Sequence, residues 1–280
     1  NRNENVEISP GAIRPVDSME NINTTTQQTI IREHDTFPGE GIYSSAIKVM
    51  GPNHFLVAEV NDNNTNIYDN VYIKLWNSET HTMVRKFIGH SDIVTDIEKL
   101  DDNHFITGSN DKTIKLWKTT EERPIDTFNG HNNNITSLAV FSPDMFISGS
   151  LDKTVILWNM EDIYNMERRD IPIKYIGHSD AVRCVDVFKD DKTFISGSSD
   201  NTIKLWNSQW DQSVTPSAII RTFLGHTDEV TALTILNNVE FVSASENSIK
   251  VWNKNNSSAL RTFNNETIHQ YNEALIYDVI

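Results

Sequence analysis

Cysteine is almost absent from this sequence, since Cys184 is the only one among 280 residues. A single cysteine cannot form an internal disulfide, so a secreted domain built on disulfides is excluded and a reducing compartment is favoured. We expect an intracellular protein of the cytoplasm, with the nucleus as the alternative. Cys184 lies in the alternating run 182–187, which predicts a strand and a small buried core residue, not a nucleophile.

Long apolar runs are also missing. No window approaches the roughly 20 consecutive apolar residues that a membrane-spanning helix needs, so we expect no membrane insertion. The polar residues 1–5 lack the apolar core of a signal peptide. The first residue is not Met, and we therefore expect a fragment, a trimmed chain or a processed form.

Positive charge is scarce, because 24 Lys and Arg face 39 Asp and Glu, for a net charge of −15. An acidic chain repels nucleic-acid phosphate and anionic lipid, so neither is expected as a main partner. A basic protein surface or tail fits the charge better, although solubility alone explains it equally well. Hydrophobic residues make up 38% of the chain, with 12 Phe and 6 Trp, which suffices for a packed core.

Sustained helical periodicity is missing as well. Residues 1–27, punctuated by Pro10 and Pro15, show no periodicity, and we interpret them as an N-terminal arm or linker. From residue 28 onward, short runs rich in Ile, Val, Phe and Thr are broken by Gly, Asn and Asp, which predicts strands. One helical turn fits only within residues 159–169.

A repeated unit ending in tryptophan dominates the rest of the chain. Trp76, Trp117, Trp158, Trp206 and Trp252 follow one another at intervals of 41, 41, 48 and 46 residues. The longer intervals come from residues 159–172 and 207–217, which both follow the tryptophan strand. Insertions therefore fall in one class of loop.

Each interval holds four runs of strand length. In the second, the expected strands are 93–97, 104–107, 113–117 and 124–128; ahead of it they are 29–37, 45–49, 55–58 and 71–76. Four strands at a regular period predict a repeat array, because one such sheet cannot bury both faces alone. Radial stacking covers each sheet with its neighbour and produces a propeller.

The repeat resembles the WD40 family over about residues 28–263. Copies of a Gly-His pair, a Ser-Gly-Ser-x-Asp turn and an Ile-Lys-Leu-Trp ending carry the resemblance. It implies an all-β propeller of four-stranded antiparallel blades over residues 28–280, with five full blades. The aspartate that usually follows the tryptophan is missing; its place is taken by Asn77, Lys118, Asn159, Asn207 and Asn253.

The closure of the ring stays open between two interpretations. Residues 267–271 and 274–280 have the pattern of two strands, and 29–37 is a candidate outer strand of the same partial or closing sixth blade. The other interpretation is a seven-bladed propeller whose C-terminal part is absent, which the apolar run ending at Ile280 favours slightly.

The resemblance also implies a hydrogen-bonded set in each blade, joining Trp, a Ser or Thr hydroxyl, His and Asp. The expected sets are His90, Thr107, Asp111 and Trp117; His131, Ser148, Asp152 and Trp158; His178, Ser196, Asp200 and Trp206; and His226, Ser243 and Trp252, with Glu246 near the place of the missing Asp. A buried indole N–H needs an acceptor, and hydroxyl and imidazole can each donate and accept. Breaking such a set costs roughly 1–3 kcal/mol.

Catalytic chemistry is not expected, although Ser, His and Asp invite comparison with a triad. A catalytic constellation is needed once, whereas this one recurs at a structural position in several blades, so we expect no catalytic residues. One His per blade without Cys at zinc spacing predicts no metal site. Residues 108–113 lack the length and second glycine of a phosphate-binding loop, so no cofactor is expected.

Function is expected at the surface, on one rim of the disc, because binding usually lies in loops on a rigid scaffold. The candidate rim residues are Asp92, Asn133, Asp180 and Asp228 after the Gly-His pairs, and Asn110, Leu151 and Ser199 in the turns. We expect these aspartates either to form an acidic ring that binds a basic segment or only to form turns. Trp210 lies outside the repeat and is either an exposed anchor or packed on a blade edge.

We therefore expect a non-catalytic scaffold that binds protein or peptide partners, basic ones included, and no nucleic acid. The alternative is a regulatory or substrate-recognition portion of a larger enzyme, such as a ubiquitin-ligase or kinase system.

Overall fold

Four-stranded antiparallel sheets contain all the strands that the computed structural model describes, in residues 42–61, 71–160, 172–209 and 217–264. There are five of these sheets, here called blades 1 to 5, and in each the strands follow one another in chain order. The all-β prediction of four-stranded antiparallel blades is confirmed. In this part of the chain, no helix is long and apolar enough to cross a membrane.

The strands of each blade have these bounds. Blade 1 contains β1 (Ile42–Gly51), β2 (His54–Asn61), β3 (Val71–Asn77) and β4 (Thr82–Phe87); blade 2 contains β5 (Val94–Lys99), β6 (His104–Ser109), β7 (Thr113–Lys118) and β8 (Asp126–Asn129); blade 3 contains β9 (Ile135–Ser142), β10 (Met145–Ser150), β11 (Thr154–Asn159) and β12 (Ile173–Ile176); blade 4 contains β13 (Val182–Phe188), β14 (Thr193–Ser198), β15 (Ile203–Asn207) and β16 (Ile219–Phe223); blade 5 contains β17 (Val230–Ile235), β18 (Glu240–Ser245), β19 (Ser248–Asn253) and β20 (Ala259–Asn264).

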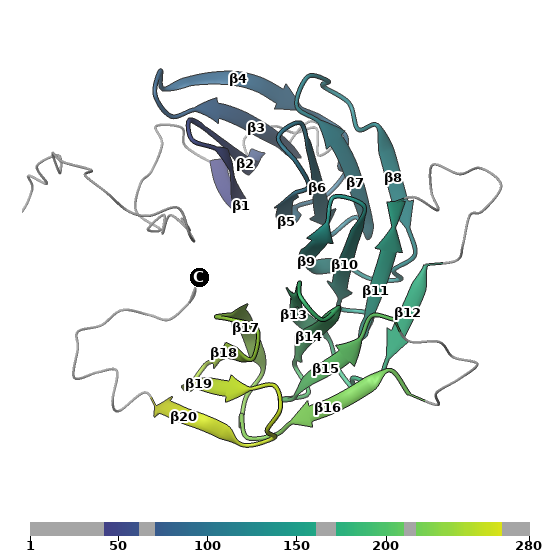
Figure 1. The fold of residues 1–280 in the computed structure, drawn as a ribbon. Helices are drawn as coiled ribbons and strands as arrows, with labels where there is room; N and C mark the ends of the chain where they lie inside the picture. Colours follow the sequence, from purple (N-terminus) through teal and green to yellow (C-terminus); the bar gives the residue numbers. More distant parts are fainter. Residues whose placement is uncertain (1–41, 62–70, 161–171, 210–216, 265–280) are drawn as a thin grey trace, which may run out of the picture.

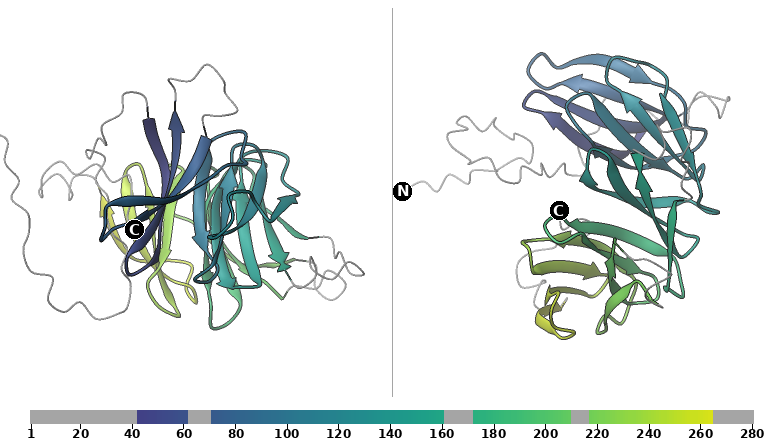
Figure 2. Two further views of the ribbon diagram at one scale, coloured as in Figure 1. Left: turned by 90° about the horizontal axis from the view of Figure 1, so that it is seen from above. Right: turned by 45° about the vertical axis from the view of Figure 1, so that its right-hand side comes forward.

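The five blades stand side by side in an arc around a common centre (Figure 1). The first strands of the blades (β1, β5, β9, β13 and β17) line the centre, and the fourth strands (β4, β8, β12, β16 and β20) form the perimeter. Seen along its edge, the disc gathers its loops on two opposite faces (Figure 2).

Some expected segments lie outside the described residues. They are the arm 1–27, the candidate strands 29–37, 267–271 and 274–280, and most of the segment 159–169. Among the described residues, the arc has one blade at each end that faces no further blade (Figure 1).

The core lies between neighbouring blades, as a propeller requires. In blades 2 to 5, both faces of the second strand are covered, and every residue of that strand after the first is buried. Phe105 pairs with Trp117 across β6 and β7, and the two rings stack with their centroids 6.0 Å apart. Phe87 of β4 meets the Phe105 ring edge-on from the preceding blade, at 5.1 Å. Phe and Trp therefore hold the two blades together.

Polar side chains also cross every boundary between the described blades. The Asp96 carboxylate of blade 2 accepts a hydrogen bond from the Leu138 N–H of blade 3 at 2.7 Å. The other boundaries are crossed by Lys48–Glu98 between blades 1 and 2 (2.7 Å), Thr136 Oγ1 to the Val182 carbonyl between blades 3 and 4 (2.8 Å), and the Ile235 N–H to Asp186 between blades 4 and 5 (2.8 Å). These contacts fix the position of each blade against its neighbour.

Glycine in the second strand lets the next blade approach closely. A Cβ built on Gly197 of β14 would lie 2.6 Å from Val230 Cγ1 and 2.7 Å from Cys184 Sγ. Cys184 is buried in the core between blades 4 and 5, as the alternating run predicts, and burial raises the pKa of its thiol well above the usual value.

The first prediction concerns this close approach. Gly197→Ala should lower the free energy of unfolding by about 1–3 kcal/mol, because the added methyl group overpacks the boundary between blades 4 and 5. The measurement is urea unfolding followed by tryptophan fluorescence. The control is Gly51→Ala, where nothing lies within 4 Å of the new Cβ. Equal stability of both variants would contradict the prediction.

Candidate binding rim and the sets beneath it

In blade 2, four side chains form one hydrogen-bonded chain. The Trp117 indole Nε1–H donates to Thr107 Oγ1 at 2.8 Å, and the Thr107 hydroxyl lies 2.7 Å from His90 Nε2. His90 Nδ1 lies 2.7 Å from Asp111 Oδ2. Because the carboxylate can only accept, Nδ1 carries the proton and Nε2 accepts from the hydroxyl. The chain runs from the core to the turn between β6 and β7.

The same geometry recurs in blades 3 and 4. In blade 3, the distances from indole to hydroxyl, from hydroxyl to imidazole and from imidazole to carboxylate are 2.9, 2.8 and 2.9 Å, along Trp158, Ser148, His131 and Asp152. In blade 4, the same three distances are 2.8, 2.7 and 2.8 Å, along Trp206, Ser196, His178 and Asp200. Each set lies in its own blade, and the structure brings no two sets together. Because the sets lie in separate blades, they do not form one common site, and this arrangement fits a structural role.

The aspartate of each set also closes the turn in which it lies. Asp111 accepts from the Ser91 N–H at 3.1 Å and from the Thr113 hydroxyl at 2.6 Å. Burial on its own would raise the pKa of Asp111, but the bonds from His90 and Thr113 outweigh it and hold the pKa well below the usual range. Burial lowers the pKa of His90, and the bond to Asp111 only partly offsets it, which keeps the imidazole neutral at pH 7.

Blade 5 departs from this pattern. Trp252 Nε1–H donates to Ser243 Oγ at 2.8 Å, and Ser243 Oγ lies 2.6 Å from His226 Nε2. His226 Nδ1, however, meets the hydroxyls of Ser245 and Ser248 at 2.9 and 3.1 Å instead of a carboxylate. Burial, together with the nearby charge of Lys250, lowers the pKa of His226 to about 4.

The sequence-based placement of Glu246 near the missing aspartate is therefore wrong. Glu246 is exposed, and two serine hydroxyls face His226 in its stead. The turn from Ser245 to Ser248 is one residue shorter than the turn from Ser109 to Thr113. The shorter turn brings the hydroxyls of its two ends to the imidazole.

The candidate rim residues lie on the face where the sets end. The Asn110 N–H donates to the Ile93 carbonyl at 2.9 Å and Ser109 Oγ to the Asp92 carbonyl at 2.9 Å, so the turn and the loop are in contact. The same pairing joins Leu151 with Asn134, and Ser199 with Ala181. The structure thus brings the loop and turn residues of blades 2 to 4 together on one face, which we call the rim. Trp210 lies outside the described residues.

The rim aspartates shape their own loops as well as carrying charge. Asp92 and Asp180 each accept from the backbone N–H of the following residue, at 2.7 and 2.8 Å, and Asn133 does the same at 2.9 Å. Asp228 accepts from Asn247 Nδ2 at 2.8 Å and from the Thr227 hydroxyl at 3.0 Å, and these bonds lower its pKa. Turn formation therefore uses some of the carboxylate oxygens, and the negative charge stays at the surface.

Cations interrupt the expected acidic ring. Lys153 Nζ lies 3.6 Å from Asp180, and Arg183 Nη2 lies 2.8 Å from Glu229. Ser199 bridges the latter pair, because it accepts from Arg183 Nε at 2.8 Å and donates to Glu229 at 2.9 Å. Arg183 and Glu229 were not among the rim residues predicted from the sequence. One feature of the sequence could have indicated Arg183: the equivalent position in the other blades is a threonine, namely Thr95, Thr136 and Thr231.

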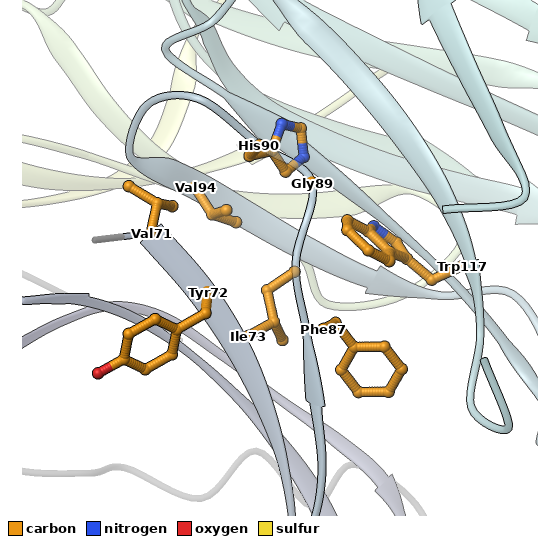
Figure 3. A pocket seen from close by; sticks show the side chains of 8 residues that line it. All are labelled: Val71, Tyr72, Ile73, Phe87, Gly89, His90, Val94 and Trp117. Atoms are coloured by element: carbon orange, nitrogen blue, oxygen red, sulfur yellow. The ribbon is translucent and has the colours of Figure 1, made fainter. Parts of the chain in front are cut away.

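A small hollow lies beside the His90 loop (Figure 3). It is lined by Val71, Tyr72, Ile73, Phe87, Gly89, His90, Val94 and Trp117. Its walls are the packed boundary between blades 1 and 2, so it belongs to the core. Elsewhere in the described chain, no group of three or more His, Cys, Asp or Glu residues is arranged to hold a metal ion.

Comparison with known proteins finds a family that matches the repeats of this chain. The family described as "WD domain, G-beta repeat" matches four segments, residues 81–118, 122–159, 171–207 and 217–253. The comparison with curated proteins finds no match. Among solved structures, the chain is similar to the computationally designed Ika8 protein, with a TM-score of 0.61 and 25% identity. The match covers 79% of this chain and 61% of the designed one, so the chain spans less than two thirds of that protein.

The second prediction tests the aspartate of a set. Asp111→Asn should cost about 1–3 kcal/mol at pH 7, because the buried imidazole loses a charged partner. The folded-state pKa of Asp111 is depressed, so its stabilisation is present above the ordinary carboxyl pKa of about 3.8 and is lost as the pH falls below it. The variant should therefore lose less stability than the wild type on acidification below about pH 4.

The measurement for Asp111→Asn is urea unfolding at a series of pH values. The control is Asp102→Asn, whose carboxylate is 91% exposed. Identical pH profiles for the wild type and Asp111→Asn would contradict the prediction.

The third prediction concerns the short turn of blade 5. Replacing residues 245–248 by the five residues 109–113 of blade 2 gives His226 a carboxylate partner. The graft should stabilise the protein by about 1 kcal/mol, which is slightly less than the usual contribution of a hydrogen bond to a charged group. Thermal unfolding measures this change. The control is the same graft with alanine in place of the aspartate, which should bring no gain.

Proposed function

Because the chain belongs to the WD40 repeat family, whose propellers act as protein-interaction modules, we propose that it is a non-catalytic scaffold. Its rim binds a protein or peptide segment that presents basic side chains. The proposal rests on one observation above all. In blades 2 to 4, the His, hydroxyl and Asp groups of the buried sets bond to one another inside the blade, so the exposed rim is the part left for recognition.

The charge of the rim supports a basic partner. Asp92 is exposed, and its carboxylate accepts one backbone hydrogen bond and has no ion pair with any described residue. Asp228 and Glu246 lie on adjacent loops of blade 5, where Asn247 bonds to Asp228. Exposed carboxylates without a cation keep their charge for a partner, and the net charge of −15 adds long-range attraction.

The cations of the rim give the binding surface a pattern. Lys153 lies beside Asp180, and Arg183 beside Glu229, so blades 3 and 4 present a mixed surface. Blade 2 also presents a cation, because the exposed Lys112 lies in the same turn as Asn110. In blade 5, the carboxylates of Asp228 and Glu246 have no ion pair with a described residue, so a partner that follows this pattern places its basic residues against blade 5.

The fourth prediction tests the rim. Substituting Asp92, Asp180 and Asp228 together by Asn should weaken binding of a fluorescent lysine-rich peptide by roughly tenfold at low salt, at about 0.5 kcal/mol for each exposed charge pair. Binding by the wild type should also weaken as the salt concentration rises. Fluorescence anisotropy measures both effects.

The matched control carries Asn at three exposed aspartates in hairpins on the opposite face, Asp102, Asp144 and Asp190. It removes the same net charge but leaves the rim intact. Equal weakening in both triple variants would show that only net charge matters, and no weakening in the rim variant would refute the basic partner. Capture of partners from cells by the two variants, compared by mass spectrometry, then identifies the natural ligand.

The alternative function keeps the same rim in a different context. As the targeting portion of a larger enzyme, for example in a ubiquitin-ligase or kinase system, the propeller would recognise the substrate while another part supplied the chemistry. The open reading frame that encloses this chain distinguishes the two functions, because an adjoining catalytic or F-box segment favours the second.

A further inference from the structure

The first strands of the five described blades each place one residue at the same level of the inner wall. Each of these residues pairs, across the sheet, with the residue that follows the Phe of the second strand. The five are Lys48, Glu98, Ala139, Asp186 and Thr234. Because the first strands line the centre of the arc (Figure 1), these residues form one level there, which we call the inner layer.

The inner layer carries more negative than positive charge. Lys48 of blade 1 reaches forward to Glu98 of blade 2, where its Nζ lies 2.7 Å from Oε1, and the two side chains are 31% and 22% exposed. Asp186 lies two blades after Glu98, with Ala139 between them in the layer. Asp96, two residues before Glu98 on β5, adds a third carboxyl group. One lysine therefore faces three carboxyl groups.

The strands around β5 supply few other charged groups. β1 has no charged residue besides Lys48, and β9 has none. The remaining titratable groups on β2, β5, β6 and β13 are His54 at the start of β2, Glu59 bonded to Lys74 (2.7 Å), Lys99 bonded to the Met50 carbonyl (2.6 Å), His104 beside Asp101 (2.9 Å), Arg183 beside Glu229 (2.8 Å) and the buried Cys184. Lys189, just after β13, acts on Asp186. Glu98 itself faces Lys48, Asp96 and Asp186.

This arrangement disfavours full ionisation of the carboxyl groups. Burial raises the pKa of Glu98 to about 7, the negative charges of Asp96 and Asp186 add to the rise, and Lys48 offsets only part of it. Burial also raises the pKa of Asp96 and of Asp186, although each accepts two backbone hydrogen bonds. The charge of Lys48 is shared, because it acts on all three groups.

We propose that the inner layer is a proton-sensitive link between blades 1 and 2. In the folded protein Glu98 holds a proton under mildly acidic conditions and releases it to solvent as the solution becomes alkaline. The Lys48–Glu98 contact is then an ion pair at alkaline pH and a hydrogen bond to a neutral carboxyl group at acidic pH. This link belongs to the frame of the propeller and does not depend on what the rim binds.

The direction of the pH effect follows from linkage between proton binding and folding. The pKa of Glu98 is raised from its ordinary value of 4.5 to about 7 in the folded protein. The bound proton therefore stabilises the folded protein fully below pH 4.5, and this stabilisation is lost as the pH rises through 7. Glutamine at position 98 cannot ionise, so it keeps the neutral state at every pH.

The experiment compares thermal unfolding of the wild type and Glu98→Gln at pH 5 and pH 8. The variant should unfold about 3–6 °C above the wild type at pH 8 and within about 1 °C of it at pH 5. Comparison at one pH cancels the histidines, which titrate in both proteins. The control is Glu121→Gln, which removes the carboxylate of the exposed pair Lys118–Glu121 and should bring no gain at pH 8. A variant that unfolds below the wild type at pH 8 would overturn the proposal.

Carbon NMR of the Glu98 side-chain carboxyl group measures the same equilibrium without unfolding. Its titration midpoint should lie near pH 7 in the wild type. Asp186→Asn should lower the midpoint, because it removes a negative charge while its amide oxygen can still accept from the Ile235 N–H. Lys48→Met should raise the midpoint, because it removes the cation. A wild-type midpoint near 4.5, or one that Asp186→Asn leaves unchanged, contradicts the proposal.

Discussion

The hydrogen bond between a buried indole and a hydroxyl of the neighbouring strand is the interaction on which the rest of this structure depends. Trp117 cannot be buried without an acceptor, and Thr107 provides one on the most buried strand of the blade. The hydroxyl then needs an acceptor for its own proton, which His90 Nε2 supplies. The proton on His90 Nδ1 needs an acceptor in turn, and the Asp111 carboxylate provides it. Each group satisfies the one before it until the chain reaches the surface.

This chain of requirements links the core to the rim. The His lies in the loop that enters a blade, and the Asp lies in the turn between the second and third strands, so their bond holds two rim segments at fixed positions. In blade 5, serine hydroxyls replace the carboxylate, and the link from His226 to the turn consists of neutral hydrogen bonds only. Neutral bonds are weaker than charge-assisted ones. In blade 5 the charge-assisted link between loop and turn comes instead from Asn247 Nδ2, which donates to the Asp228 carboxylate at 2.8 Å.

The sequence predicted the strands and the members of the sets because these depend on local pattern and on repetition. In the second interval, the expected runs 104–107 and 113–117 coincide with β6 and β7 to within two residues. It did not predict what depends on loop length and on contacts between blades. Glu246 was misplaced because one missing residue in a turn changes which side chains reach the imidazole. The pairing of Arg183 with Glu229 was missed because the two residues lie in different blades.

The same distinction bears on function. A buried set and a catalytic triad use the same residue types, and they differ in where the last group ends. Here the imidazole faces a hydroxyl that is already engaged by an indole and a carboxylate that closes a turn, so neither nitrogen of His90 is left for a substrate. Side chains that complete one another inside a blade specify a rigid frame. Under the proposed function, recognition uses groups that the frame leaves unengaged, namely the exposed carboxylates and cations of the rim.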